Sequence, residues 1–248
     1  MDLSTLPVFS TLLDLTSTGL MALISLLTPA TGALASALAV VLVTLLVRAA
    51  LVPAGVAQAK AEQTRARLAP RLRELQKRHR GDRERLQRAT MELYRAEGAS
   101  PLAGCLPLLL QAPIVGLLYS VFLHPVIGDH ANELLAQNLF GVPLGASLVG
   151  ALRAGTADHA TWIVIGCLVL AIALVGELTL RLFRPSPPEA SNASGIPAVP
   201  AGLLGVLQFA TAVIALFVPL AAGLYLLTTV AWTLVQRLIL RRLYPAPS

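Results

Sequence analysis

Arg48 is the residue of this sequence whose chemistry most requires an explanation. It lies within the apolar segment AVVLVTLLVRAALVPAG, residues 39–55, and no acidic residue occurs within ten positions on either side. A permanently charged guanidinium near the centre of a bilayer costs at least about 2.5–3.5 kcal/mol. Such a residue usually faces the interior of a helix bundle or a water-filled cavity, so Arg48 is a candidate functional residue.

Several polar side chains are available to share a cavity with Arg48. Thr44 precedes it by one helical turn and lies on the same helix face. Gln111, Tyr119 and Tyr225 occur in other apolar segments and would contribute further polar groups. The alternative is a lipid-facing Arg48 whose side chain extends to the headgroups. The polar neighbours favour a cavity, although Tyr and Gln also serve as hydrogen-bond partners between membrane helices.

The residue types that carry covalent or metal chemistry do not form a recognisable set. The four histidines are scattered, with no second His or Cys at ligand spacing, and no GxSxG, HExxH or glycine-rich phosphate loop occurs. Glu177 lies near an apolar segment, but Arg181 follows it by four residues, which favours an ion pair over a catalytic acid. We therefore predict no catalytic residue, no metal, no cofactor and no enzymatic activity.

The elements that position these residues are predicted to be membrane helices. The chain is 56% hydrophobic and 13% charged, with a mean hydropathy of +0.73, whereas about 25% of a soluble domain is charged. Of the 19 Lys and Arg residues, 12 lie between Lys60 and Arg95. The net charge of +6 therefore comes mostly from one basic segment. Such a segment beside a membrane is expected to meet anionic lipid headgroups rather than nucleic acid.

Hydropathy predicts five spans, each of about twenty residues. Three lie at about residues 33–55, 101–123 and 161–182, and an apolar region at 201–240 is divided into two by Pro219. Apart from Arg48, seventeen Lys and Arg residues then fall on one side of the membrane and one, Arg153, on the other. The positive-inside rule places the N-terminus outside and the C-terminus in the cytoplasm.

Residues 1–30 and 31–248 are predicted to form different parts of the chain. Residues 1–30 are apolar but contain Asp14, which favours an interfacial amphipathic helix on the outer face over an additional span. Residues 31–248 would form the membrane core. Within that core, residues 57–98 are predicted to be a cytoplasmic helical hairpin, and the Pro/Ser-rich residues 183–200 a cytoplasmic linker.

The predicted hairpin has thin apolar stripes and Arg-rich outer faces. Apolar residues recur at helical spacing on either side of the turn RHRGD, residues 78–82. They are Leu68, Leu72 and Leu75, then Leu86, Ala89 and Leu93. The pattern fits equally well a solvated hairpin held beside the lipid and a docking surface for a cytosolic partner.

The run GASPLAGCLPLLLQAPIVGLLYSVF, residues 98–122, closely resembles the second core span of the YidC family of membrane protein insertases, which has mitochondrial and chloroplast relatives. Three further segments match in the same order. TLLVRAALVP, residues 44–53, is similar to the first core span with its groove arginine, and residues 58–98 are similar to the cytoplasmic hairpin. VPLAAGLYLLTTVAWTLVQRLI, residues 218–239, is similar to the final span, where Tyr225 and Trp232 meet aromatic positions of the family.

This resemblance implies an all-α membrane protein with five transmembrane helices around a hydrophilic groove that is open to the cytoplasm and to lipid. It also implies an N-terminal interfacial helix and a cytoplasmic helical hairpin. The implied substrate-binding groove residues are Arg48, Thr44, Gln111, Tyr119, Tyr225 and Trp232. The sequence departs from the family at Val230, where Asn is common, and in its short tail RRLYPAPS.

The implied function is that of an insertase and chaperone of the bacterial cell membrane, in a small form without a large periplasmic domain and without nucleotide hydrolysis. The implied partners are nascent membrane proteins and anionic lipids. The Sec translocon, targeting factors and the ribosome are further candidates through the basic hairpin. The alternatives are a small transporter or channel that binds an anionic solute at Arg48, and a structural subunit of a translocon.

Overall fold

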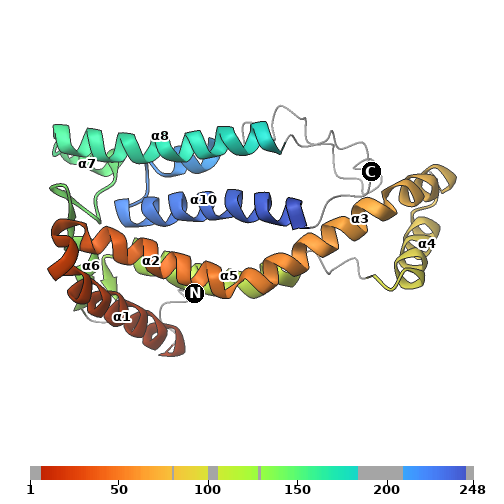
Figure 1. Ribbon diagram of the computed structural model, residues 1–248, viewed down its shortest axis with the longest axis horizontal. Coiled ribbons are helices and arrows are strands. Elements are labelled where there is room, and N and C mark those ends of the chain that lie inside the picture. The colour runs from red at the N-terminus through yellow and green to blue at the C-terminus, as the bar shows by residue number, and fades with distance from the viewer. Residues whose placement is uncertain (1–6, 80, 100–105, 128–129, 184–208, 244–248) are drawn as a thin grey trace.

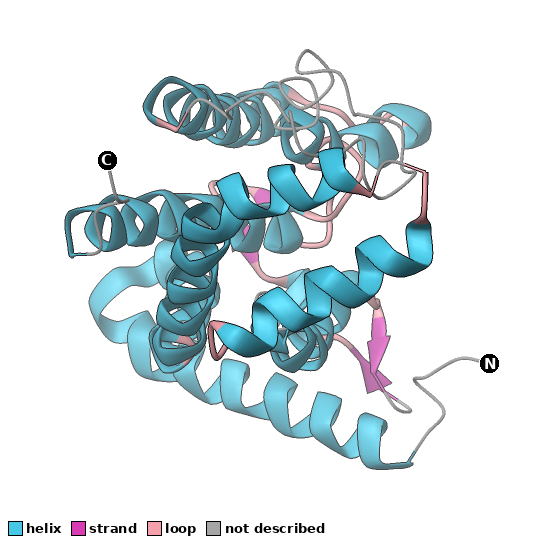
Figure 2. Ribbon diagram, turned by 90° about the vertical axis from the view of Figure 1, so that its right-hand side faces the viewer, coloured by secondary structure: helices cyan, strands magenta, loops and turns pink. Residues whose placement is uncertain are grey.

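The computed structural model describes residues 7–79, 81–99, 106–127, 130–183 and 209–243, and most of these are helical (Figure 2). Among them, three segments are long and apolar enough to cross a membrane: 11–50, His159–Leu182 and Leu220–Leu243. The predicted second and fourth spans, at residues 101–123 and from residue 201, lie partly outside the described residues. The count of five spans therefore stays a prediction.

The first two long helices form an angular pair at the outer side of the bundle. Helix α1, Pro7–Thr31, is followed by the single 3-10 turn η2, Gly32–Leu34, and by α2, Ala35–Ala50. The change of direction occurs at Gly32, whose φ of +53° favours glycine. The buried side chains of α1, Leu13, Leu20 and Ile24, lie on one face, and α1 packs against α2 and α5, Leu106–Leu123 (Figure 1). The interfacial position predicted for residues 1–30 stays a prediction.

Helix α2 continues into α3, Val52–Arg78, through a joint at Leu51. The sequence predicts a break at Pro53, and the observed joint lies two residues earlier. Proline has no N–H to donate to the carbonyl four residues before it, so the distortion falls on the N-terminal side of Pro53. The flanking bonds are kept, with Leu51 N donating to Val47 O and Gly55 N to Leu51 O, both at 3.1 Å. Arg48 therefore lies in the last turn of α2.

Helices α3 and α4, Arg83–Ala96, form the hairpin that projects from one end of the bundle (Figure 1). Leu68 and Tyr94 are buried between them. The Asp82 side chain accepts a hydrogen bond from Arg85 N at 3.0 Å and caps α4. Glu97 pairs with Arg67 at 3.2 Å and also with Arg71, which fixes the base of α4 against α3.

The centre of the bundle is α10, Leu220–Leu243, which packs between α2 on one side and α8, His159–Leu182, on the other (Figure 1). Ala221 and Ala222 are fully buried. A Cβ atom on Gly223 would lie 2.5 Å from Leu168 Cδ2 of α8, so glycine lets the Leu168 side chain pack directly against α10. Small residues bring membrane helices together in this way because close backbone approach increases van der Waals contact.

The connection between α5 and α8 covers the end of the bundle opposite the hairpin. It contains the strand pair β1, Val126–Ile127, with β2, His130–Ala131, then α6, Glu133–Ala136, the strand pair β3, Asn138–Leu139, with β4, Val142–Pro143, and α7, Leu148–Ala154. Buried Asn132 donates to Val121 O at 2.7 Å and His124 O at 3.0 Å, so its side chain satisfies carbonyls at the end of α5.

The apolar region predicted to divide at Pro219 does so. Residues 209–214 are helical, a turn follows, and α10 begins at Leu220. Leu220 N donates to Ala146 O and Ala221 N to Leu144 O, both at 2.9 Å. These bonds satisfy N–H groups that the first turn of a helix leaves unpaired, and they fix α10 to the connection.

Candidate functional site

One face of α10 carries polar side chains along most of its length. Tyr225, Thr229, Trp232 and Gln236 follow one another at spacings of four, three and four residues, which places them on one helix face. Gly223 contacts α8 and lies about 200° around the helix from Tyr225. This polar stripe, defined by those four residues, therefore faces away from α8.

Tyr225 is the innermost member of the polar stripe and contacts α5. Its side chain is only 3% exposed, and its ring centroid lies 6.2 Å from that of Tyr119 and 5.9 Å from that of Phe122. Two residues predicted to share a site, Tyr119 and Tyr225, are therefore brought together. Burial of a tyrosine usually comes with a partner for its hydroxyl group. Within the described part of the chain, however, the Tyr225 hydroxyl has none.

Trp232 and Gln236 link the other end of the stripe to the hairpin. Trp232 Nε1 donates a hydrogen bond to Gln236 Oε1 at 2.9 Å. Gln236 lies against Gly55 near the start of α3, where a Cβ atom would come within 1.8 Å of Gln236 Nε2. Sequence reasoning did not select Gln236, Thr229 or Gly55 as site residues. The helical spacing from Tyr225 is the signal that identifies the first two.

Thr44 and Arg48 lie one turn apart on α2, which packs against α10. Thr44 is 1% exposed, and its hydroxyl group donates to Val40 O at 2.7 Å. Arg48 is partly exposed, and no hydrogen bond or ion pair joins it to a described residue. Gln111 belongs to α5, but its side chain lies outside what the structure describes.

The position of Arg48 at the end of a helix offsets only part of the free-energy cost of placing its charge in the membrane. A cation in the last turn of a helix gains about 0.3–1 kcal/mol from the helix dipole. This gain is smaller than the roughly 2.5–3.5 kcal/mol that a charge costs near the bilayer centre. Arg48 therefore needs hydration or a polar contact in addition to the dipole, and its partial exposure permits hydration.

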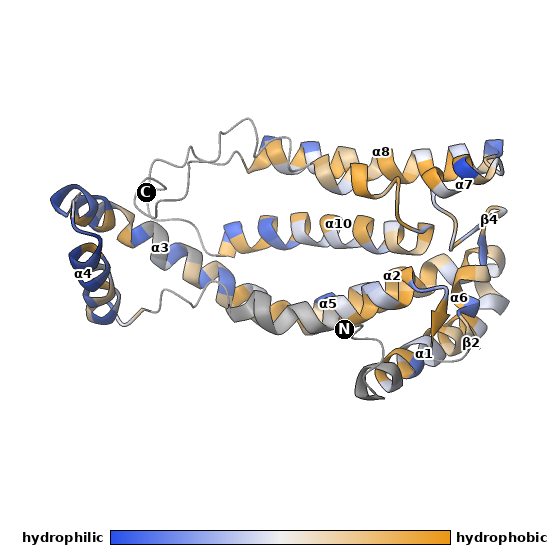
Figure 3. Cartoon of the chain, turned by 180° about the vertical axis from the view of Figure 1, so that it is seen from behind, coloured by the Kyte–Doolittle hydropathy of each residue, from blue (hydrophilic) through white to orange (hydrophobic). Residues whose placement is uncertain are grey.

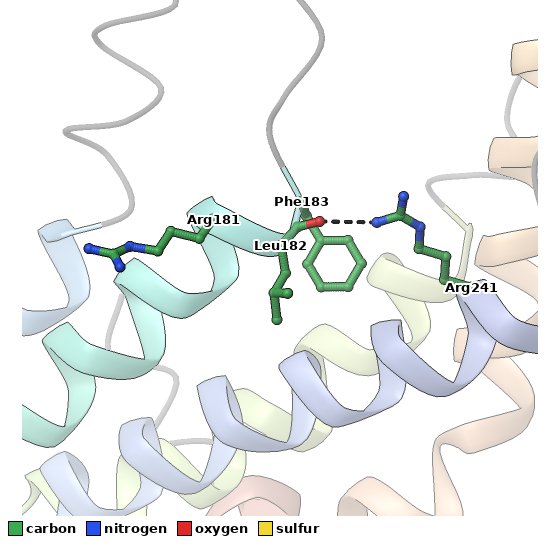
Figure 4. A pocket seen from close by; sticks show the side chains of 4 residues that line it. All are labelled: Arg181, Leu182, Phe183 and Arg241. Carbon is green, nitrogen blue, oxygen red and sulfur yellow. Dashed lines mark hydrogen bonds between the residues drawn. The ribbon is translucent and has the colours of Figure 1, made fainter.

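A separate pocket of about 410 Å³ lies where α8 and α10 end, lined by Arg181, Leu182, Phe183 and Arg241 (Figure 4). Arg241 Nη1 donates to Leu182 O at 3.0 Å, and Arg241 Cζ lies 5.8 Å from the centroid of the Phe183 ring. Arg181 Nε donates to Glu177 Oε1 at 2.7 Å, which confirms the predicted ion pair. These contacts close the end of α8 and leave the polar stripe untouched.

The described residues contain no group of three His, Cys, Asp or Glu side chains that would hold a metal ion.

Asp158 precedes α8 and caps it. The Thr161 hydroxyl group and then the Thr161 backbone N–H donate to its carboxylate at 2.7 and 2.8 Å, and these bonds lower the pKa of Asp158. The polar stripe itself carries phenol, hydroxyl, indole and amide groups.

The apolar helices and the polar stripe define a helical, multi-pass membrane protein. The family described as 60Kd inner membrane protein matches residues 27–246, and the chain belongs to this family, whose curated members include YidC proteins. A protein named membrane protein insertase YidC from Streptomyces avermitilis is 29% identical over 224 residues, covering 85% of this chain and 52% of the relative.

Two further relatives with the same name match shorter stretches at higher identity. The protein from Oceanobacillus iheyensis is 39% identical over 99 residues, covering 38% of this chain and 39% of the relative. The protein from Xanthomonas campestris is 44% identical over 88 residues, covering 36% of this chain and 15% of the relative. The chain thus spans about half of the first relative and less of the other two.

Proposed function

We propose that this chain is a membrane protein insertase that moves transmembrane segments of nascent proteins from the cytoplasm into the bilayer. The observation that carries the proposal is the family match over residues 27–246, which includes Arg48 and the whole polar stripe. The substrate-binding groove would be lined by Arg48, Thr44, Gln111, Tyr119, Tyr225 and Trp232. No covalent chemistry is required, so neither a cofactor nor a catalytic residue is part of the proposal.

The proposed architecture has five spans, with the N-terminus outside and the C-terminus in the cytoplasm. Residues 1–30 would lie at the outer interface, residues 31–248 would form the core, and residues 57–98 and 183–200 would be cytoplasmic. Charge placement supports this orientation, because the hydrophilic hairpin and the basic ends of α8 and α10 lie at the same end of the bundle (Figure 3).

The groove would act by shortening the apolar path of the substrate. The polar outer segment of a substrate must cross about 30 Å of hydrocarbon. Water and the Arg48 guanidinium would solvate that segment over part of the distance, and the positive charge would favour acidic tails. The apolar segment would then move sideways into lipid, where burial of apolar surface supplies about 25 cal/mol per Å².

The hairpin supplies the proposed contacts with the cytoplasm. Its exposed Lys and Arg side chains suit anionic lipid headgroups, and the same surface is a candidate site for the Sec translocon, targeting factors or the ribosome. The ion pairs of Glu97 with Arg67 and Arg71 join the end of α4 to α3 within this hairpin.

The charge of Arg48 is tested in proteoliposomes with single-span substrates that carry acidic or neutral tails. Arg48→Ala is expected to slow insertion of the acidic-tailed substrate at least threefold more than that of the neutral one, and Arg48→Lys to restore most of the difference. Arg153→Ala, which removes an exposed cation at the opposite end, is the matched control. Equal insertion by Arg48→Ala and the wild type would remove the charge from the mechanism.

The same vesicles distinguish insertion from solute transport, the alternative function. An insertase is expected to integrate a substrate without measurable flux of small anions. Flux in the absence of any substrate polypeptide, abolished by Arg48→Ala, would support a transporter instead. Integration by the purified chain alone would also exclude a purely structural role in a translocon.

A further inference from the structure

Two buried hydroxyl groups on the polar stripe have no hydrogen-bond partner. Of the buried side-chain nitrogen and oxygen atoms in the described residues, only Tyr225 Oη and Thr229 Oγ1 are unpaired. The two residues are four apart on α10 and lie on the same face of the helix. Unpaired polar atoms are rare inside native proteins, and each requires an explanation.

The unpaired hydroxyl group of Thr229 is not a general property of threonines in these helices, because the adjacent Thr228 is paired. A buried threonine in a helix usually donates to the carbonyl four residues earlier. Thr228 does so to Leu224 O at 2.8 Å, and Thr233 to Thr229 O at 2.8 Å. Thr44 and Thr179 do the same on α2 and α8. Thr229 alone among these five leaves its hydroxyl group unpaired.

Packing alone does not account for these two hydroxyl groups. Valine and phenylalanine have nearly the same shapes as threonine and tyrosine and would fill the same space without a buried unpaired oxygen. Removing such an oxygen is expected to stabilise the resting chain, because a buried polar group without a partner is unfavourable. The two oxygens are therefore kept at a cost to stability.

We infer that Tyr225 and Thr229 form a hydrogen-bonding site for a polar side chain carried within the apolar part of an entering segment. The site accepts Ser, Thr, Asn or Gln, and Thr229 is its specificity-determining residue. This inference rests on the proposed function. Neither oxygen is accessible in the structure, so the segment reaches them by displacing the side chains that cover them, and the rings of Tyr119 and Phe122 lie against Tyr225.

The chemistry of the membrane interior explains why such a site is useful. A polar side chain within an entering helix has no partner in hydrocarbon and enters it with difficulty. Two hydroxyl groups one turn apart offer both donors and acceptors to that side chain while the segment leaves the cytoplasm. They offer nothing to a segment built only from Leu and Ala.

The test compares insertion of two single-span substrates into proteoliposomes that contain the full chain. One substrate has an apolar segment with a central Asn, and the other has Leu at that position. Thr229→Val and Tyr225→Phe are each expected to lower the ratio of Asn-substrate to Leu-substrate insertion by about three- to tenfold. In Thr229→Val, insertion of the Leu substrate should stay within about twofold of the wild type.

Thr228→Val is the matched control, because Thr228 is adjacent and buried but its hydroxyl group is already paired. An unchanged ratio in both Thr229→Val and Tyr225→Phe overturns the site, as does an equal fall in Thr228→Val. If Thr229→Val does not fold, the ratio in Tyr225→Phe decides alone. A wild type that inserts neither substrate overturns the proposed function itself, and this outcome differs from intact insertion with an unchanged ratio.

Discussion

Gln236 and Gly55 are in direct contact, although they lie near opposite ends of the sequence. A Cβ atom at position 55 would come within 1.8 Å of Gln236 Nε2. Gln236 also accepts the indole hydrogen bond of Trp232 at 2.9 Å. This contact joins the base of the hairpin to the polar stripe on α10. A movement of α3 at this point therefore displaces the Gln236 side chain and its hydrogen bond with Trp232.

Gly55→Ala is predicted to displace the Gln236 side chain and to break its hydrogen bond with Trp232. The expected loss of unfolding free energy is about 1 kcal/mol, the usual net value of one hydrogen bond. In a Gln236→Ala background the same change should be neutral or stabilising, because alanine favours helix. Thermal unfolding of the four variants in lipid nanodiscs measures the coupling. Equal effects of Gly55→Ala in both backgrounds would show that the contact has no energetic role.

Gly223→Ala is predicted to force the Leu168 side chain of α8 out of its place against α10. The new Cβ atom would lie 2.5 Å from Leu168 Cδ2, and overpacking of this kind costs about 1–3 kcal/mol. Gly166→Ala on α8 is the control, since nothing lies within 4 Å of a Cβ atom there. That variant should gain up to about 1 kcal/mol from helix propensity. Shifts of the same sign and size in both variants would contradict the close packing.

Asn132→Ala is predicted to destabilise the connection between α5 and α8 by more than about 2 kcal/mol. The change leaves the buried carbonyl group of Val121 and the partly buried one of His124 without the Asn132 amide, and an unsatisfied buried group costs about 1–3 kcal/mol. Asn138→Ala is the control, because Asn138 is exposed and its side chain makes a long bond, of 3.4 Å, to Ala136 O. Its effect should stay within about 0.5 kcal/mol. Chemical denaturation of both variants provides the comparison.

The cap of α8 is predicted to weaken in acid. Hydrogen bonds from Thr161 lower the pKa of Asp158 in the folded chain below its value in the unfolded chain. The contribution to stability is therefore complete above the ordinary aspartate pKa of about 3.9 and is lost as the pH falls through the lower folded value. Asp158→Asn should reduce the change in melting temperature between pH 6 and pH 3. An identical pH profile in this variant and the wild type would contradict the role of the cap.

Local sequence signals predicted several elements closely. The apolar run predicted at 161–182 corresponds to α8, His159–Leu182, because hydropathy and the preceding Asp158 cap mark its limits. Pro219 divides the last apolar region as predicted, since proline cannot continue a hydrogen-bonded helix. The sequence predicts the break between α2 and α3 at Pro53, and the structure has it at Leu51. The missing N–H of Pro53 leaves the carbonyl group four residues earlier without its helical hydrogen bond, so the distortion lies before the proline.

The contacts of the candidate site depend on information that a sequence does not carry. The pairing of Tyr119 with Tyr225, and that of Gly55 with Gln236, requires knowledge of how α5, α3 and α10 pack. A sequence also does not reveal whether the hydroxyl group of a helical threonine bonds to a backbone carbonyl group. Thr228 and Thr229 therefore cannot be distinguished without the structure, in which only Thr228 is bonded. For Arg48 and Thr44, spacing predicted a shared face, while the hydroxyl group of Thr44 bonds within its own helix.

Backbone hydrogen bonds fix the start of α10, whereas side-chain contacts hold its far end. Leu220 and Ala221 fix the helix to the connection between α5 and α8, while the far end is joined to α8 by the exposed side chain of Arg241. Twenty-four residues of helix are roughly 36 Å long. A tilt of about 5° at the start of the helix therefore moves its far end by roughly 3 Å over that length. A small change where α10 meets the connection is thus enlarged along the helix toward the end that carries Arg241.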